Sequence, residues 1–186
     1  MRRISRKRFA LAILAAAIVA GGFQVVGSLA SGGGQSQFAG ARNATARYHN
    51  LSAAQADGYG IFPDAQGIAC IDNQPTGGMG VHYVKGSLVF KPDGTPNTDL
   101  DAAHPEALVF APNAGGHLRL AALEYIVFQG AWDAQHSDPP TLFGREFNVT
   151  PDGNRFGIPA FYSLHAWVWE PNSDGMLEPW NPRVHC

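Results

Sequence analysis

The clearest structural signal in the chain is the stretch Phe161-Tyr162-Ser163-Leu164-His165-Ala166-Trp167-Val168-Trp169. It is rich in aromatic and apolar residues, and we expect it to form one strand that extends over residues 158–170. Because successive side chains of a strand point to opposite faces, His165, Trp167 and Trp169 should share a face. One imidazole beside two indoles predicts a pocket with a single reactive group in an apolar wall.

Beyond Gly60 the chain consists of short apolar runs separated by Gly, Pro, Asn and Asp, a pattern typical of short strands joined by turns. The 22 glycines and 13 prolines agree with this. Two pairs of runs have the spacing of hairpins, namely residues 81–84 with 87–91 and residues 106–111 with 117–128.

Helix signals are confined to residues 37–57, which we expect to form one helix or a kinked pair. Ser52 followed by Gln55 is a capping-box pattern. The predicted fold class is therefore α+β, with this N-terminal helix packed on an antiparallel sheet that curls into a partial barrel or sandwich. Long loops near residues 92–105 and 129–157 should cover the open end of the sheet.

The first residues have the composition of a signal peptide. Basic residues precede a long apolar run, and Ser28-Leu29-Ala30 places small residues at the two positions that a signal peptidase reads. We expect a signal peptide over residues 1–30, a flexible Gly- and Ser-rich linker over residues 31–37 and a single globular domain over residues 38–186. The protein is then secreted or extracytoplasmic.

Removal of this leader leaves an acidic domain. The chain has 13 basic and 15 acidic residues, and five of the basic residues but none of the acidic ones lie in the leader. Eight basic residues then face 15 acidic ones, a formal charge of −7, which argues against nucleic acid as a partner. No stable membrane span is expected after cleavage; if the run over residues 9–29 stays uncleaved, it is about long enough to act as an anchor.

The two cysteines, Cys70 and Cys186, are expected to form a disulfide. An exported protein meets an oxidising compartment, where such a pair usually closes. The alternative is a reactive thiol or half of a metal site, but the chain has no Cys-x-x-Cys spacing that favours a metal.

Three apolar runs each contain one polar residue that we place in a common site: His82, Glu124 and His165. A buried carboxylate needs a partner, because an unpaired one is strongly disfavoured, and no other charge lies near Glu124 in its run. Two imidazoles and one carboxylate would hold Zn²⁺ or Fe²⁺ and leave a coordination position open. The ion would act on a small-molecule ligand, and Glu124 would be a ligand or, in an enzyme, a general base.

Other interpretations stay open. In one alternative, Glu124 is held without a metal, by a histidine or by the hydroxyl of Tyr83 or Tyr125; in another, the three polar residues have separate structural roles. Trp167 and Trp169 are candidate walls of a carbohydrate- or lipid-binding module without catalysis. His104, in an acidic loop, is a candidate rim residue.

Several phrases of the chain together resemble a group of small exported bacterial proteins. The resemblance covers most of the chain from about Ala44 onward and implies a self-contained exported domain, without implying an activity, fold or cofactor. The phrases are Gly78-Met79-Gly80-Val81-His82-Tyr83, Pro105-Glu106-Ala107-Leu108, Leu123-Glu124-Tyr125, Leu164-His165-Ala166-Trp167-Val168-Trp169 and Asn181-Pro182-Arg183-Val184-His185-Cys186.

Overall fold

The structure is a computed structural model that describes residues 30–186, with side chains from residue 33 onward. The predicted signal peptide falls, apart from Ala30, outside the described residues. Among the helices that are described, none is both long and apolar enough to cross a membrane.

Three helical segments open the described chain: α1 (Ala30–Thr45), the 3-10 helix η1 (Ala46–His49) and α2 (Leu51–Ala56). This confirms the kinked helical region predicted near the N-terminus. The cap of α2 is Asn50 rather than a residue of the Ser52 capping box, because the Asn50 side chain accepts a hydrogen bond from the backbone N–H of Ser52.

The predicted linker over residues 31–37 lies within α1. Tertiary contacts hold this glycine-rich segment against the domain. The Gln37 side chain accepts a hydrogen bond from the backbone N–H of Phe143, and the ring of Phe38 stacks on that of Phe143 with 4.3 Å between centroids. Composition alone indicated a flexible chain here, and these contacts with a distant segment explain the difference.

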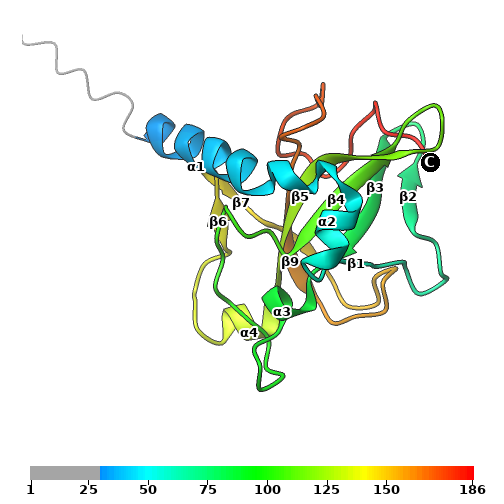
Figure 1. The fold of residues 1–186 in the computed structure, drawn as a ribbon. Coiled ribbons are helices and arrows are strands. Elements are labelled where there is room, and N and C mark those ends of the chain that lie inside the picture. The colour runs from blue at the N-terminus through cyan, green and yellow to red at the C-terminus, as the bar shows by residue number, and fades with distance from the viewer. Residues whose placement is uncertain (1–29) are drawn as a thin grey trace, which may run out of the picture.

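The remaining chain forms an open, antiparallel seven-stranded sheet with strand order β1-β3-β4-β5-β9-β8, and β2 shares the outer edge of β3 with β1. Two short helices, α3 and α4, lie at the same end of the sheet (Figure 1). The bounds are β1 (Gly60–Ile61), β2 (Cys70–Asn73), β3 (Gly77–Val84), α3 (Gly86–Val89), β4 (Ala107–Pro112), β5 (Leu118–Phe128), α4 (Gln129–Asp133), β8 (Asn148–Thr150) and β9 (Phe161–Ala166), with a separate hairpin of β6 (Thr141–Leu142) and β7 (Arg145–Glu146).

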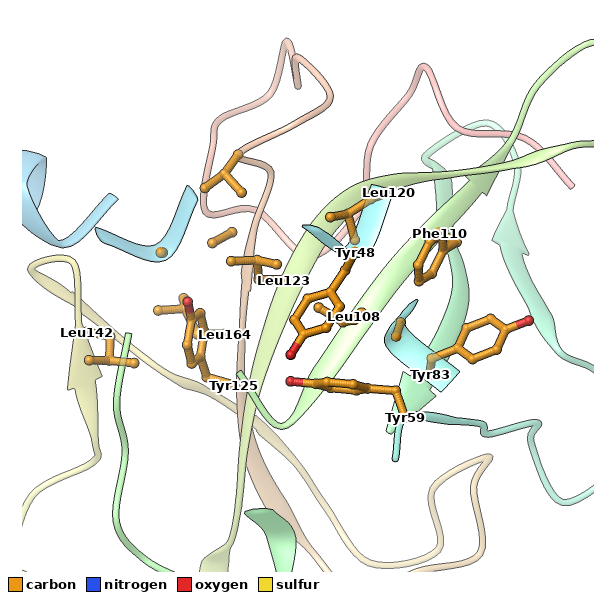
Figure 2. Close-up of a cluster of buried hydrophobic side chains, with 14 of the residues drawn as sticks. Tyr48, Tyr59, Tyr83, Leu108, Phe110, Leu120, Leu123, Tyr125, Leu142 and Leu164 are labelled. Atoms are coloured by element: carbon orange, nitrogen blue, oxygen red, sulfur yellow. The ribbon is translucent and has the colours of Figure 1, made fainter. Parts of the chain in front are cut away.

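One face of the sheet packs against the N-terminal helices and forms the main hydrophobic core. Tyr48 and Tyr59 lie over the strands there, beside Leu108, Leu123 and other buried side chains (Figure 2). The alternation of β3, β4, β5 and β9 sends every second side chain to this face. The helix-covered face thus carries most of the apolar burial, which leaves the opposite face free for other groups.

The opposite face contains a smaller apolar cluster at one end, where Val109 and Ala122 pack with Trp167 and Val184. A β-bulge between Val109 and Phe110 makes both Ala121 and Ala122 of β5 face this cluster. Beyond the bulge the side chains of β5 alternate again, so that Leu123 points to the main core and Glu124 to the opposite face.

Two strand predictions and one loop prediction differ from the structure. Residues 87–91 do not pair with 81–84: most of them form α3, a turn that buries Val89. The predicted loop over 129–157 contains α4, the β6–β7 hairpin and β8. The strand predicted over 158–170 ends at Ala166, where the backbone N–H of Val168 turns back to the Ala166 carbonyl.

A disulfide between Cys70 and Cys186 joins β2 to the C-terminal segment, as predicted. The segment is also held by paired backbone hydrogen bonds between Gly78 and Asn181. This approach requires glycine in β3, since a Cβ atom at Gly77 would lie 2.2 Å from the Asn181 carbonyl oxygen and φ at Gly77 is +109°.

We expect a Cys70→Ser, Cys186→Ser double variant to unfold at lower urea concentration than the native protein. The disulfide spans 116 residues, and loss of such a constraint on the unfolded chain reduces stability by about 2–5 kcal/mol. Equilibrium urea unfolding followed by tryptophan fluorescence measures the change. An unchanged free energy of unfolding would show that the backbone contacts at Gly78 alone hold the C-terminal segment.

Glu106, just before β4, is a buried carboxyl group on the edge of the main core. One of its side-chain oxygens accepts a hydrogen bond from the backbone N–H of Ile126 at 3.0 Å. That N–H lies beyond the last β4–β5 pair, Ala107 with Glu124, so Glu106 replaces a missing sheet hydrogen bond. Burial raises the pKa of Glu106 to about 8.

The protonated Glu106 carboxyl stabilises the fold relative to the unfolded chain, in which this group has its ordinary pKa of 4.5. This contribution is complete below the ordinary pKa and is lost as the pH rises to about 8, so the folded protein should lose stability over that range. A Glu106→Gln variant keeps a hydrogen-bond acceptor and does not ionise, so its loss of stability from about pH 5 to about pH 9 should be smaller than that of the native protein. Urea unfolding across this range measures the slopes. Glu146→Gln, at an exposed position, is the control and should keep the native slope; equal slopes for both variants would contradict the assignment.

Candidate metal centre

Glu124, His165 and His82 come from three strands of the face opposite the helices. Glu124 on β5 lies directly opposite His165 on β9. His82 lies on β3, and β3 and β5 are separated by β4, so their backbones are roughly 10 Å apart. On β4, Ala107 lies opposite Glu124 and Val109 lies opposite His82, so the His82 and Glu124 side chains meet diagonally above β4.

The heteroatoms of the three side chains converge. His82 Nε2 lies 3.3 Å from Glu124 Oε2 and 3.4 Å from His165 Nε2. His165 Nδ1 lies 3.7 Å from Glu124 Oε1. One potential ligand atom from each residue lies within 4.8 Å of the other two. The sheet therefore brings together the three residues that the sequence placed in a common site.

Burial keeps all three groups neutral near pH 7. Desolvation lowers the pKa of His82 to about 4, and the nearby Arg155 charge acts in the same direction. Desolvation also lowers the pKa of His165 well below its ordinary value, with a further contribution from His82. The pKa of Glu124 is raised to about 8 by desolvation, while the Ser163 side chain opposes this shift. Two neutral imidazoles then offer lone pairs to the space between them.

The hydrogen bonding of the cluster is incomplete. The Nδ1 atoms of His82 and His165 are buried and make no hydrogen bond within the described part of the chain. A buried imidazole nitrogen without a partner destabilises a protein by about 1–3 kcal/mol. The contacts among the three side chains thus leave one nitrogen of each imidazole without a hydrogen bond, whereas buried polar groups in a core are normally hydrogen-bonded.

A pocket of about 330 Å³ opens beside the cluster, with His82 and Glu124 in its wall. The remaining side chains of the wall are apolar and come from β1, β3, β5, β9, the α3 region and the loop before β9. The two polar side chains are therefore accessible from an apolar chamber, whereas His165 lies outside the lining. Ligand pockets commonly combine apolar walls with a small number of polar groups in this way.

Two loops that form one side of the pocket are fastened to each other. Asp64 is buried, and Arg155 Nη2 donates to its Oδ2 at 2.8 Å. The backbone N–H of Ala65 also donates to the Arg155 carbonyl at 3.0 Å. The Arg155 guanidinium holds the pKa of Asp64 below its usual range. These contacts position Phe62 and Phe156, whose rings lie 5.9 Å apart and both face the pocket.

The two predicted tyrosines point to the other side of the sheet. Tyr83 and Tyr125 are among the buried side chains of the helix-covered core (Figure 2). The Tyr125 hydroxyl donates to the Ala102 carbonyl at 2.7 Å. Strand alternation separates both hydroxyls from Glu124, so neither tyrosine holds the carboxyl group, an arrangement that the sequence had left open.

The other predicted ligand-binding residues also lie outside the pocket lining. Trp167 stacks beside His165, with 6.1 Å between ring centroids, and its Nε1–H donates to the Glu178 carbonyl. Trp169 follows the end of β9 and packs against His49, so the two indoles do not form a common wall. His104 is exposed and pairs with Asp101 at 2.8 Å.

Sequence reasoning missed the apolar lining, which includes Phe62, Val89, Phe156 and Ile158. These residues lie on short elements and loops that no periodic pattern marks. One signal was available: large apolar residues in segments rich in Gly, Pro, Asn and Asp need a surface to pack on, and the described structure supplies that surface in the pocket.

The chemistry of the donor set matches known classes of metal site. Two histidines and one carboxylate bind Zn²⁺ in some hydrolases and Fe²⁺ in some oxygenases, each time with a coordination position left for a ligand. Comparison with known proteins found no family model, curated protein or solved structure that matches this chain. The cluster and the pocket beside it are therefore the basis for assigning a function.

A Glu124→Gln variant distinguishes a neutral cluster from a buried ion pair. Because burial raises the pKa of Glu124 to about 8, the native side chain carries a proton at pH 6, and we expect the amide to change the free energy of unfolding of metal-free protein by about 1 kcal/mol or less. Urea unfolding in the presence of a chelator measures this. A loss of about 3–5 kcal/mol would instead indicate a carboxylate paired with a protonated imidazole.

Proposed function

We propose that this protein binds a divalent transition-metal ion through His82, Glu124 and His165, and that the ion acts on a small ligand in the adjoining pocket. The observation that carries the proposal is the convergence of three buried ligand atoms within 4.8 Å of one another. The cluster is on rigid strands, two of which are neighbours in the sheet. Metal-dependent catalysis and metal-dependent binding both fit this arrangement.

The distances between side chains support the proposal. In a tetrahedral zinc site with bonds of about 2.0–2.1 Å, neighbouring ligand atoms are roughly 3.3–3.4 Å apart. His82 Nε2 lies at 3.3 Å from the Glu124 oxygen and at 3.4 Å from His165 Nε2. Two of the three pairs of ligand atoms thus have this spacing, and the third pair, between His165 and Glu124, lies within 4.8 Å.

A bound divalent ion would supply Lewis acidity at its open coordination position, either to polarise a ligand or to activate water. The protein residues have separate tasks. His82 and Glu124 face the pocket, so they orient any group that approaches the open position. His165 provides the third ligand from behind, and the apolar walls exclude bulk water. Zn²⁺ and Fe²⁺ are the two ions that the ligand set favours.

Elemental analysis of purified protein, after incubation with Zn²⁺, Fe²⁺ or Cu²⁺ and removal of excess ion, tests the proposal. We expect about one ion per chain, and a His82→Ala, His165→Ala double variant should lose at least about 100-fold in affinity because two ligands are gone. Isothermal titration with the preferred ion measures the affinity without reference to any activity.

The matched control is a His104→Ala, His136→Ala double variant, which removes two exposed imidazoles. It should retain native stoichiometry and affinity. A native protein that remains free of metal in all three incubations would overturn the proposal, and so would equal metal binding by both double variants.

A further inference from the structure

We infer that the pocket beside the cluster takes a neutral, mainly apolar ligand of about two fused rings, with one polar group directed at His82 and Glu124. This rests on the proposed function only for the polar end, which would meet the metal. The apolar part of the inference stands on the walls of the pocket. It specifies the class of ligand on which the metal centre would act.

The polarity of the lining carries the first step. Of the side chains that line the pocket, only His82 and Glu124 are polar, and both belong to the cluster. A sugar or a peptide would bury hydroxyl or amide groups that have no side-chain partner here, and each such group disfavours binding by about 1–3 kcal/mol. A ligand with one polar group, placed at the cluster, avoids this cost.

The charge of the surroundings carries the second step. Of the cations next to lining residues in the chain, Arg155 pairs with Asp64 and Lys85 with Asp57, and Lys91 lies outside the lining. The pocket wall itself contains no lysine or arginine among the described residues. An anionic ligand would therefore meet no positive side chain in the wall, and its charge would enter an apolar chamber at a large desolvation cost. A neutral ligand is favoured.

Size and access complete the argument. The pocket volume of about 330 Å³ is roughly twice that of a cavity of about 150 Å³ that accepts benzene, which suits a bicyclic ligand. Ile61 and Phe90, which are 54% and 42% exposed, both contribute to the lining. They are two of five large apolar residues that are exposed in the described part of the chain. Their position gives the pocket an apolar entrance.

The test uses N-phenyl-1-naphthylamine, a neutral aromatic probe whose fluorescence rises in apolar surroundings. We expect saturable binding of one probe per metal-free protein. Competition should be effective with 1-naphthol, at least about tenfold weaker with naphthalene-1-sulfonate, and absent with glucose, given the desolvation costs above. Stronger competition by the sulfonate or by glucose would overturn the neutral, apolar class.

Two variants fill the pocket from different sides: Ile126→Trp on β5 and Ile158→Trp in the loop before β9. Each should weaken probe binding at least about tenfold by occupying the volume. The matched control is Val149→Trp. Val149 is exposed, lies outside the pocket lining and belongs to the edge strand β8, where it pairs with Tyr162 of β9. Circular dichroism checks that each variant is folded. Native affinity in both folded pocket variants would overturn the inference.

Metal titration separates this inference from the proposed function. If the metal binds and the polar end meets it, added metal should increase the affinity for 1-naphthol but not for naphthalene, which has no polar group. Probe binding without any metal binding would refute the proposed function and retain the apolar pocket. Metal binding without probe binding would refute the pocket ligand and retain the metal centre. Equal effects of metal on 1-naphthol and naphthalene would refute the orientation.

Discussion

The burial of the Glu124 carboxyl group is the constraint on which the rest of the site depends. A carboxylate in the middle of a sheet must be neutral or must be held by a cation. The sheet meets this requirement by placing His165 opposite Glu124 and by bringing His82 of β3 within 3.3 Å of the carboxyl group. An α+β fold with a bulged β5 is the framework that brings these positions into register.

The two faces of the sheet divide stability from chemistry. The helix-covered face buries tyrosines and leucines in one continuous core, and Glu106 completes the backbone hydrogen bonding at its edge. The opposite face contains the cluster and the pocket, between the small apolar cluster near Trp167 and the loops that carry Phe62 and Phe156. A substitution that enlarges the pocket therefore need not touch the main core.

Much of this arrangement followed from the sequence, and what was missed has physical causes. A lone carboxyl in an apolar run identified Glu124, because burial without a partner is so unfavourable, and period-2 alternation placed His82 and His165 on strands. Alternation did not reveal that the β9 strand ends at Ala166, which separates Trp167 from Trp169. The pocket lining was out of reach because residues such as Ile61 and Phe156 meet only through the tertiary fold.

The fastening between Asp64 and Arg155 has a consequence for motion. It joins two loops at the surface, whereas the strands beneath them are held by the sheet hydrogen bonds and the main core. Opening this wall breaks one ion pair and few backbone bonds, so it belongs to the class of local fluctuations that need far less free energy than global unfolding. Exchange of molecules between solvent and the chamber can then be fast while the cluster of His82, Glu124 and His165 stays rigid.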